Sequence, residues 1–342
     1  MLHKLTLLKV IVALFTLCCV HYLFISSLDI KLCGVVSLKN VVVSHSDVDG
    51  VVSAALIHRI SKDVKVIGCY LSSIRALTRS LNLAVNNVLV NGASHLIISD
   101  LNIASTNQLQ VVKSILSKLT GIGVEVYWFD HHRWFEKYIK ELEEIGVYMH
   151  IDENLVAAEI IAKYFNINDP YSLKLVELAV DDDRFINENP LSTKWRRVLR
   201  WYDWSFRRKA VKALAEGDIW PKWADEAYKA IEEQYNNMLK KIVEELKVVN
   251  INEYRTAIIF NVPGKIHPGD IHLELLSRGL EADIYILVYS GGTSFRSKVI
   301  DVALLAQKLG GNGHTHSAGA PVKFTSIEEV KNTLSKILPP KH

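Results

Sequence analysis

The sequence predicts an α/β protein, in which a parallel-sheet domain is joined by a helical connector to a smaller α/β C-terminal domain. Short strand-like segments alternate with helical stretches in the first half of the chain, which is typical of βαβ units. Those segments are continuous apolar runs, as expected for parallel strands buried on both faces. The same alternation returns near the C-terminus. The length of 342 residues fits two domains, at about 150 residues per domain.

The first alternating region begins after Lys39. Helices of ten or more residues separate its short strands, which is why the pattern indicates a parallel sheet rather than hairpins. We expect strands at 41–43, 64–70, 96–99, 124–129 and 147–151, and helices at 51–60, 71–84, 106–119 and 134–145.

Residues 153–247 are almost wholly helical in pattern, and 224–246 is a long charge-rich helix without Gly or Pro. Beyond it we expect strands at 258–262, 284–289, 293–297 and 321–324, and helices at 271–277, 302–309 and 327–338. The predicted divisions are a hydrophobic N-terminal segment at 1–39, a first domain at 40–223, a connector at 224–250 and a second domain at 251–342.

Composition excludes several classes of protein. Apolar residues make up 49% of the chain and charged residues 23%, with only 8 Pro and 17 Gly, so the chain is neither disordered nor fibrous. Four cysteines exclude a disulfide scaffold. The net charge of +3 does not by itself indicate a polyanionic partner.

The N-terminal segment has two interpretations. Residues 10–25 are apolar except for Thr16 and His21, and the stretch 5–28 is just long enough to span a membrane as a helix. The alternative is an extension upstream of the true start that is no part of the working protein. We therefore expect a cytoplasmic protein, anchored to a membrane if this segment is retained. The oligomeric state is left open.

Acidic and imidazole side chains gather where predicted strands end. His45-Ser46-Asp47-Val48-Asp49 follows the first strand, Asp100 follows 96–99, and Asp130-His131-His132 follows 124–129. A fourth cluster, Asp181-Asp182-Asp183, ends a predicted helix. Each cluster alone is compatible with helix capping or a polar turn. Ligands of open parallel sheets bind at the carboxyl ends of the strands, so clusters sharing that edge favour a functional site.

The donor types indicate a binuclear metal centre. Carboxylates mixed with neutral imidazoles suit Mn²⁺, with Mg²⁺ or Fe²⁺ as alternatives, and exclude a thiolate zinc site; the sequence also contains no CxxC pair. Two such ions can activate a water molecule and clamp the attacking and leaving oxygens of a phosphoryl displacement. The sequence therefore predicts a phosphoryl-transfer chemistry at this edge.

These motifs resemble the signature motifs of the DHH phosphoesterase superfamily, named for a triplet such as Asp130-His131-His132. In the smaller domain, residues 310–314 and 317–319 resemble the GGxGH…AAG motif of the DHH-associated domain, although Asn312 and Ser317 depart from it. Residues 294–297 resemble the strand whose arginine meets a substrate phosphate. The resemblance runs from about Asn40 to the end of the chain.

The resemblance implies roles for particular residues. One metal would be bound by His45 and Asp47, the other by Asp49, His131 and Asp181, and Asp100 would bridge both. Among the three consecutive aspartates the choice of Asp181 stays open. The expected catalytic residues are His132, facing the substrate phosphate, and Asp130, orienting an imidazole. Substrate contacts are implied for Arg296, Gly311, Gly313 and His314.

The activity that the resemblance implies is hydrolysis of phosphodiester bonds in single-stranded or short oligonucleotides. The enzyme would resemble RecJ-type exonucleases, oligoribonucleases or bisphosphonucleoside phosphatases, with two divalent ions, Mn²⁺ or Mg²⁺, and a nucleic-acid substrate. One alternative is a cyclic-dinucleotide phosphodiesterase, which a membrane anchor would favour. Another is a non-catalytic replication scaffold, although every ligand position is filled. The Arg-Lys-Lys motif of the family's pyrophosphatases is absent from the sequence.

Residues 184–212 are rich in basic and aromatic side chains, which is compatible with a single-stranded nucleic-acid surface. The alternative is an amphipathic helix whose apolar face is core. Trp201 and Trp204 fall off that face and keep the nucleic-acid interpretation open. The residues at core spacing are Trp195, Val198, Leu199, Tyr202 and Phe206.

Overall fold

The computed structural model describes residues 38–60 and 64–341. The hydrophobic stretch 5–28, and with it nearly all of the predicted N-terminal segment 1–39, lies outside the described residues. Among the residues that are described, no helix combines the length and the apolar character needed to cross a membrane.

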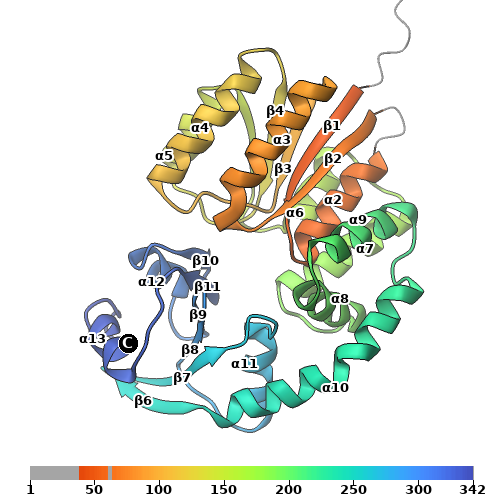
Figure 1. Ribbon diagram of the computed structural model, residues 1–342. Coiled ribbons are helices and arrows are strands. Elements are labelled where there is room, and N and C mark those ends of the chain that lie inside the picture. Colours follow the sequence, from red (N-terminus) through yellow and green to blue (C-terminus); the bar gives the residue numbers. More distant parts are fainter. Residues whose placement is uncertain (1–37, 61–63, 342) are drawn as a thin grey trace, which may run out of the picture. The chain divides into compact units, whose positions relative to one another are not determined.

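The first sheet has five strands in the order β2-β1-β3-β4-β5 (Figure 1). Its strands are β1 (Leu38–His45), β2 (Val64–Ser72), β3 (His95–Ser99), β4 (Glu125–Asp130) and β5 (Val147–Ile151). β1, β3, β4 and β5 pair in parallel, with Val42 opposite Ile97 and Ile97 opposite Tyr127. The predicted parallel-sheet domain is confirmed.

Helices cover both faces of this sheet. They are α2 (Val48–Ile60), the 3-10 turn η1 (Ile74–Ala76), α3 (Leu77–Asn91), α4 (Thr106–Thr120), α5 (Glu136–Glu143) and α6 (Ala157–Tyr164). Alternate residues of β1 enter two different cores: Val42 packs with α2 and α6, whereas Val41 and Val43 pack with α3 and α4. Burial on both faces explains why the strands are continuous apolar runs.

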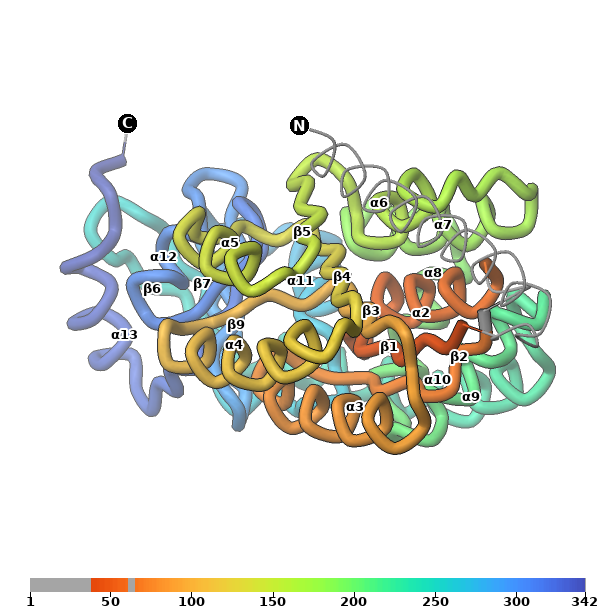
Figure 2. Tube along the Cα trace, turned by 90° about the horizontal axis from the view of Figure 1, so that it is seen from above, coloured from red at the N-terminus to blue at the C-terminus, as the bar shows by residue number. Residues whose placement is uncertain are grey.

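A helical region follows the first sheet, as the sequence predicts. It consists of α6, α7 (Pro170–Asp183), α8 (Pro190–Trp201), α9 (Trp204–Glu216) and the long α10 (Lys222–Glu244). α10 carries the chain from this region to the second sheet (Figure 1). Figure 2 shows α6, at the start of this region, on the side of the first sheet opposite α3 and α4. The helix predicted over 224–246 extends beyond the end of α10. β6 (Lys247–Ile251) begins within the predicted connector and pairs antiparallel with the following strand, β7 (Tyr254–Val262).

The second sheet is mixed, in the order β10-β11-β9-β8-β7-β6. Its other elements are β7 (Tyr254–Val262), α11 (Pro268–Ser277), β8 (Ile284–Tyr289), β9 (Gly292–Ser297), α12 (Val302–Lys308), β10 (Asn312–His314), β11 (Ser317–Ala320) and α13 (Ile327–Leu334). Only β7 and β8 pair in parallel among the strands of this sheet that the structure describes. The smaller α/β domain expected from the sequence is therefore present.

One predicted strand is wrong. Residues 321–324 form no strand; instead, β10 and β11 form a hairpin immediately before them. Pro321 lacks the N–H that a sheet ladder needs, which ends the pairing there. The hairpin is built from a Gly-rich stretch that carries little strand propensity. A Cβ on Gly311 would overlap the Gly319 backbone oxygen, so this close approach requires glycine.

Candidate metal centre and basic pocket

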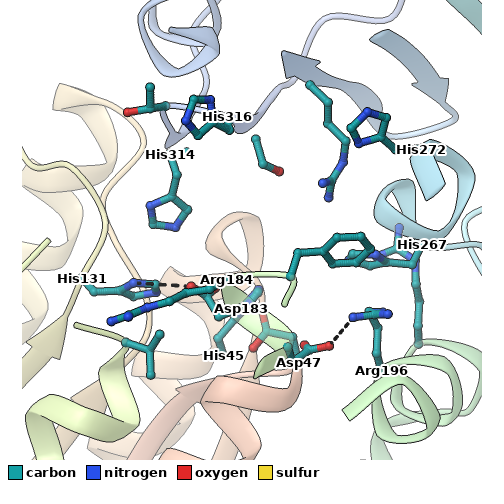
Figure 3. A pocket seen from close by; sticks show the side chains of 18 of the residues that line it. His45, Asp47, His131, Asp183, Arg184, Arg196, His267, His272, His314 and His316 are labelled. Carbon is teal, nitrogen blue, oxygen red and sulfur yellow. Dashed lines mark hydrogen bonds and ion pairs between the residues drawn. The ribbon is translucent and has the colours of Figure 1, made fainter. Parts of the chain in front are cut away.

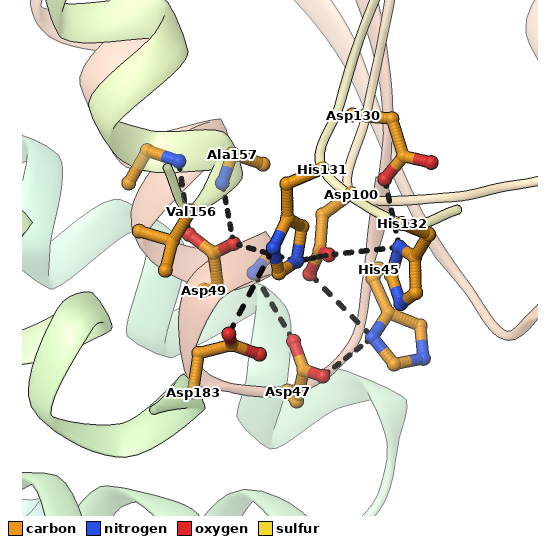
Figure 4. A network of polar contacts seen from close by, with 12 residues as sticks. His45, Asp47, Asp49, Asp100, Asp130, His131, His132, Val156, Ala157 and Asp183 are labelled. Atoms are coloured by element: carbon orange, nitrogen blue, oxygen red, sulfur yellow. Dashed lines mark hydrogen bonds and ion pairs between the residues drawn. The ribbon is translucent and has the colours of Figure 1, made fainter. Parts of the chain in front are cut away.

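Polar side chains lie at the carboxyl ends of three adjacent strands, at one edge of the first sheet (Figure 4). β1 ends at His45, Asp100 follows β3 directly, and β4 ends at Asp130. Because these strands are parallel, their carboxyl ends lie at the same edge. The structure thus brings the three predicted strand-end clusters together.

The turn after β1 depends on a glycine. Ser44 Oγ donates a hydrogen bond of 2.6 Å to the Gly50 carbonyl, and Gly50 N–H donates to Asp47 Oδ1 at 3.1 Å. A Cβ on Gly50 would overlap the His45 backbone oxygen. No side chain fits in that space, so the tight packing of strand end against helix start requires residue 50 to be glycine.

Replacing Gly50 with alanine is therefore expected to displace the strand end that carries His45. We expect Gly50→Ala to lower the free energy of unfolding by about 1–3 kcal/mol, the usual range for overpacking, and to weaken Mn²⁺ binding. Urea denaturation and Mn²⁺ titration would measure both effects. The control is Gly264→Ala, whose added Cβ meets nothing within 4 Å. Wild-type stability and Mn²⁺ affinity in Gly50→Ala would contradict this account of the turn.

Asp100 lies between two imidazoles and is 2% exposed. Its Oδ2 is 3.6 Å from His45 Nδ1, and its Oδ1 is 3.3 Å from His131 Nε2. The backbone of Asp100 has φ +55°, a left-handed conformation that few residues other than Gly, Asn and Asp adopt. A hydrogen bond of 2.9 Å from its N–H to the Phe129 carbonyl ties this turn to β4.

Three further carboxylates surround this pair of imidazoles. Asp47 Oδ2 is 2.6 Å from His45 Nδ1, and Asp49 Oδ2 is 3.7 Å from His131 Nε2. Asp183 Oδ2 is 3.8 Å from His131 Nδ1. Asp49 also accepts hydrogen bonds of 2.8 and 2.9 Å from the first two backbone N–H groups of α6, which fix its orientation.

The cluster concentrates negative charge in a buried place. Burial, followed by the charge of Asp100, raises the pKa of Asp49 well above its ordinary value. Burial likewise raises the pKa of Asp183, with Asp100 and Asp47 adding to it. Burial disfavours the charged form of His131 and by itself would lower its pKa. The hydrogen bond to Asp100 and the charges of the surrounding carboxylates have the larger combined effect, and they raise the pKa of His131 to about 11. Such a site is stabilised by cations.

The donor set fits divalent metal ions. Asp100 Oδ2 and His131 Nε2 are buried and make no hydrogen bond within the part of the chain that the structure describes. Buried polar atoms without a partner are rare and call for an explanation such as an ion. Ligand atoms of His45, Asp47 and Asp100 lie within 4.8 Å of one another. Oxygen and imidazole donors of this kind suit Mn²⁺ or Mg²⁺.

The three consecutive aspartates at the end of α7 point in different directions. Asp181 accepts hydrogen bonds of 2.9 and 3.0 Å from the N–H groups of Glu188 and Asn189, and a third from Ser192 Oγ. Asp181 therefore organises the loop before α8, while Asp183 lies beside His131. Successive helical positions are rotated by about 100°, and a run of identical residues gives no signal for the one that faces the site.

His132 is held by a buried carboxylate. Its Nδ1 is 2.8 Å from Asp130 Oδ1, and Trp134 Nε1 donates to Asp130 Oδ2 at 2.6 Å. Burial alone lowers the pKa of His132, but Asp130 outweighs burial and the pKa is raised. The ring centroid of His314, from β10, lies 4.9 Å from that of His132. Burial, then the charges of His132 and His131, lowers the pKa of His314 to about 3.

A cavity of about 1180 Å³ adjoins this cluster. His45, Asp47, His131 and Asp183 lie on one side of it, and His314 and His316 on the opposite side (Figure 3). Gly313 also lines the cavity. Gly311 does not line the cavity. A glycine is needed at this position because the backbone of Gly319 packs closely against it in the β10–β11 hairpin.

Basic side chains are also part of the cavity lining. Arg296, on β9, is 8% exposed, and its Nε has no hydrogen-bond partner among residues 38–60 and 64–341. Sequence motifs did not point to four of the other lining residues, because their elements meet only in the folded chain; these are Arg133, His267, His272 and Lys298.

In the region 184–212, three of the predicted core residues are buried, whereas arginines rather than tryptophans reach the cavity. Trp195, Val198 and Leu199 are buried in the core, as the helical spacing predicts. Trp204 is 42% exposed and Trp201 is partly buried under Lys265, whose Nζ lies 4.3 Å from its ring centroid. Neither tryptophan lines the cavity. The arginines of this region that do are Arg184, Arg196, Arg200 and Arg207.

Comparison with known proteins identifies the fold. No protein-family model matches the sequence, and no curated protein matches it. Among solved structures, the DHH domain of a member of a ribosomal-protein family matches with a TM-score of 0.58 and 15% identity, over 88% of this chain and 86% of that chain. Exonuclease RecJ bound to manganese matches with a TM-score of 0.51 and 15% identity, over 89% and 91%.

RecJ from Thermus thermophilus, in complex with Mn²⁺, matches with a TM-score of 0.53 and 15% identity. The match covers 89% of this chain but only 53% of the Thermus chain. At these identities the likeness is one of fold. The chain has the DHH fold seen in RecJ, as the resemblance of its motifs predicts.

Proposed function

We propose that this chain, which has the fold of RecJ-like DHH proteins, is a two-metal phosphoesterase that hydrolyses phosphodiester bonds in single-stranded or short oligonucleotides. The observation that carries the proposal is the position of Asp100, a buried carboxylate between His45 and His131 with an oxygen that has no hydrogen-bond partner in the described chain. A carboxylate so placed can bridge two cations, and the cluster around it adjoins a cavity rich in arginine.

The candidate ligands divide into two groups around Asp100. We assign His45 and Asp47 to one ion, and Asp49, His131 and Asp183 to the other. Asp183 takes the place that the resemblance gave to Asp181, because Asp181 is engaged by the loop before α8. Ions held by these residues would activate a water molecule as the nucleophile and neutralise charge on the phosphoryl group.

His132 is assigned to the substrate phosphate. Asp130 accepts from Nδ1 of His132, which orients the ring and leaves Nε2 for the substrate. From that atom the imidazolium would donate a hydrogen bond to a phosphoryl oxygen or protonate the leaving oxygen. Trp134 completes the arrangement by donating to the second oxygen of Asp130, which holds that carboxylate in place.

The second domain is assigned to the remaining part of the substrate. Arg296 offers a guanidinium, whose planar fork matches a phosphate. The N–H groups of a Gly-rich hairpin can approach an anion closely because no Cβ intervenes. His314 brings this hairpin next to the DHH triplet, with its ring centroid 4.8 Å from that of His131.

The proposal is tested by incubating the purified protein with Mn²⁺ and end-labelled single-stranded RNA and DNA, from dinucleotides to about 16 nucleotides. A cyclic dinucleotide and an adenosine bisphosphate are included in parallel. We expect Mn²⁺-dependent shortening of the linear substrates that EDTA abolishes. Opening of the cyclic dinucleotide alone would replace the proposal with a cyclic-dinucleotide phosphodiesterase. No hydrolysis with any divalent ion would contradict catalysis and favour a scaffold.

A further inference from the structure

The helix α7 ends in a turn that normally contains glycine. Ile186 N–H donates to the Asp181 carbonyl at 3.0 Å, and Phe185 N–H donates to the Asp182 carbonyl at 3.1 Å. This pair of bonds is a Schellman motif, whose left-handed position is usually occupied by glycine or asparagine. Here that position is Phe185, with φ +55°. A bulky residue in this conformation is strained, and it persists only where surrounding contacts hold it.

The ring of Phe185 is held by groups from several elements. The guanidinium carbon of Arg196, on α8, lies 4.5 Å from the ring centroid, and that of Arg296, on β9, lies 5.2 Å from it. The ring of His267 stacks on it, with centroids 5.9 Å apart and 24° between the planes. A Cβ on Gly269, in the first turn of α11, would overlap the Phe185 ring. Phe185 therefore connects the segment after α7 to the second sheet and to α11.

Arg296 depends on this ring more than Arg196 does. Arg196 forms ion pairs with Asp182 and Asp270, at 2.8 and 3.1 Å, which fix its guanidinium. Arg296 forms no ion pair within the described chain, and its buried Nε has no hydrogen-bond partner there. A cation within about 6 Å of a ring centroid is attracted to the face of that ring. Phe185 thus supplies an attraction that orients Arg296 where no counter-charge does.

The same side chain links Arg296 to the candidate metal centre. Phe185 follows Asp183 by two residues, and Asp183 Oδ2 lies 3.8 Å from His131 Nδ1. The hydrogen bonds of the Schellman motif fix the backbone between Asp183 and Phe185. Asp183, Phe185 and Arg296 all line the cavity. The separation between the metal ligands and Arg296 is therefore set through the ring of Phe185.

We infer that Phe185 is a positioning residue, whose ring holds the Arg296 guanidinium at a fixed separation from the metal centre so that both engage one single-stranded substrate. The inference rests on the proposed function, because it names the residue that orients a substrate contact of the same site. Phe185 acts through Arg296 rather than on the substrate itself. Removing the ring should therefore weaken substrate binding only while Arg296 is present.

Glycine at position 185 separates positioning from folding, because it removes the ring and suits the left-handed backbone. Binding of single-stranded RNA and DNA tetranucleotides is measured by isothermal titration calorimetry with Ca²⁺, for wild type, Phe185→Gly, Arg296→Gln and the double variant. The matched control is Ile186→Ala, because Ile186 is the next residue, is 46% exposed and does not line the cavity. Mn²⁺ affinity is measured for every variant, and wild-type hydrolysis of bis(p-nitrophenyl) phosphate with Mn²⁺ reports on the metal centre separately.

We expect Phe185→Gly to bind the tetranucleotide at least about tenfold more weakly than wild type, which is the scale of one charge-assisted contact. In the Arg296→Gln background the same substitution should change the affinity by less than about twofold, because the group that the ring positions is already gone. The Mn²⁺ affinity of Phe185→Gly should equal that of wild type. Ile186→Ala should bind both the tetranucleotide and Mn²⁺ as wild type does.

Gly269→Ala tests the same contact from the other partner. Its Cβ would displace the Phe185 ring, so the substitution should weaken tetranucleotide binding in wild type and have little effect in Phe185→Gly, where that space is free. The control is Gly264→Ala, whose added Cβ meets nothing within 4 Å. Equal effects of Gly269→Ala in the two backgrounds would contradict the seating of the ring and overturn the inference.

Wild-type tetranucleotide affinity in Phe185→Gly would overturn the inference, as would an equal loss with and without Arg296. A loss of Mn²⁺ affinity as large as the loss of tetranucleotide affinity would overturn it too, because Phe185 would then act on Asp183 and the end of α7. So would failure of wild type to bind either tetranucleotide. If binding depends on the ring but bis(p-nitrophenyl) phosphate is not hydrolysed, the inference stands and the proposed function fails.

Discussion

Asp100→Asn is expected to reduce Mn²⁺-dependent hydrolysis by about a thousandfold, the upper end of the loss caused by removing one group that stabilises the transition state. The amide keeps the size of the carboxylate but has only one acceptor oxygen and no charge, so it cannot bridge two cations. Asp100 is 2% exposed, and no solvent replaces the lost ligand. Steady-state kinetics over a range of Mn²⁺ concentrations would measure the loss.

The same variant should remain folded. Removing one negative charge from a buried group of carboxylates relieves repulsion, so the Tm without metal should equal or exceed that of wild type. Mn²⁺ stabilises wild type by mass action, and that increase in Tm should be much smaller in Asp100→Asn. The control is Asp218→Asn, an exposed aspartate outside the cluster. Near-wild-type hydrolysis by folded Asp100→Asn would contradict the bridging role.

Asp270→Asn is expected to destabilise the protein by about 3–5 kcal/mol, the usual effect of removing one partner of a buried ion pair. Asp270 is 3% exposed, at the start of α11. Its Oδ1 is 3.1 Å from Arg196 Nη2 and its Oδ2 is 3.0 Å from Arg197 Nε. Tyr235 on α10 donates to the same Oδ2 at 2.7 Å. The substitution leaves two arginines without their shared counter-charge and loosens the contact of α8 and α10 with α11.

Urea denaturation monitored by tryptophan fluorescence measures this effect. Glu274→Gln is the matched control, since Glu274 lies on the same helix and pairs with Arg278 at 2.7 Å on the protein surface. Surface pairs of this kind contribute about 0.5 kcal/mol or less. If Asp270→Asn changes the free energy of unfolding no more than Glu274→Gln does, the buried network does not stabilise the junction.

Local patterns were sufficient to predict the sheet that carries the candidate centre. Val41–Val43 is apolar without alternation because its side chains enter cores on both sides of the sheet. A parallel sheet then requires that residues following neighbouring strands meet at one edge, which places His45, Asp100 and the segment after β4 together. This part of the site follows from strand order and pairing alone.

The parts that could not be predicted depend on contacts distant in sequence. Asp183 rather than Asp181 faces His131 because the loop before α8 engages Asp181, and no local signal distinguishes three identical residues. The β10–β11 hairpin has no strand signal, because glycines that allow close approach resemble a loop. Arg200 and Arg207 reach the cavity only because α8 and α9 pack beside it, and the spacing of these residues in the sequence does not indicate this.

The central claim is that the strand-end cluster is a two-metal centre, and a crystal structure grown with MnCl₂ tests it most directly. Anomalous difference maps at the manganese edge should show two peaks about 3.5–4 Å apart. Both should contact Asp100, one also His45 and Asp47, and the other Asp49, His131 and Asp183. No manganese peak at Asp100, or manganese bound only elsewhere, would contradict the account.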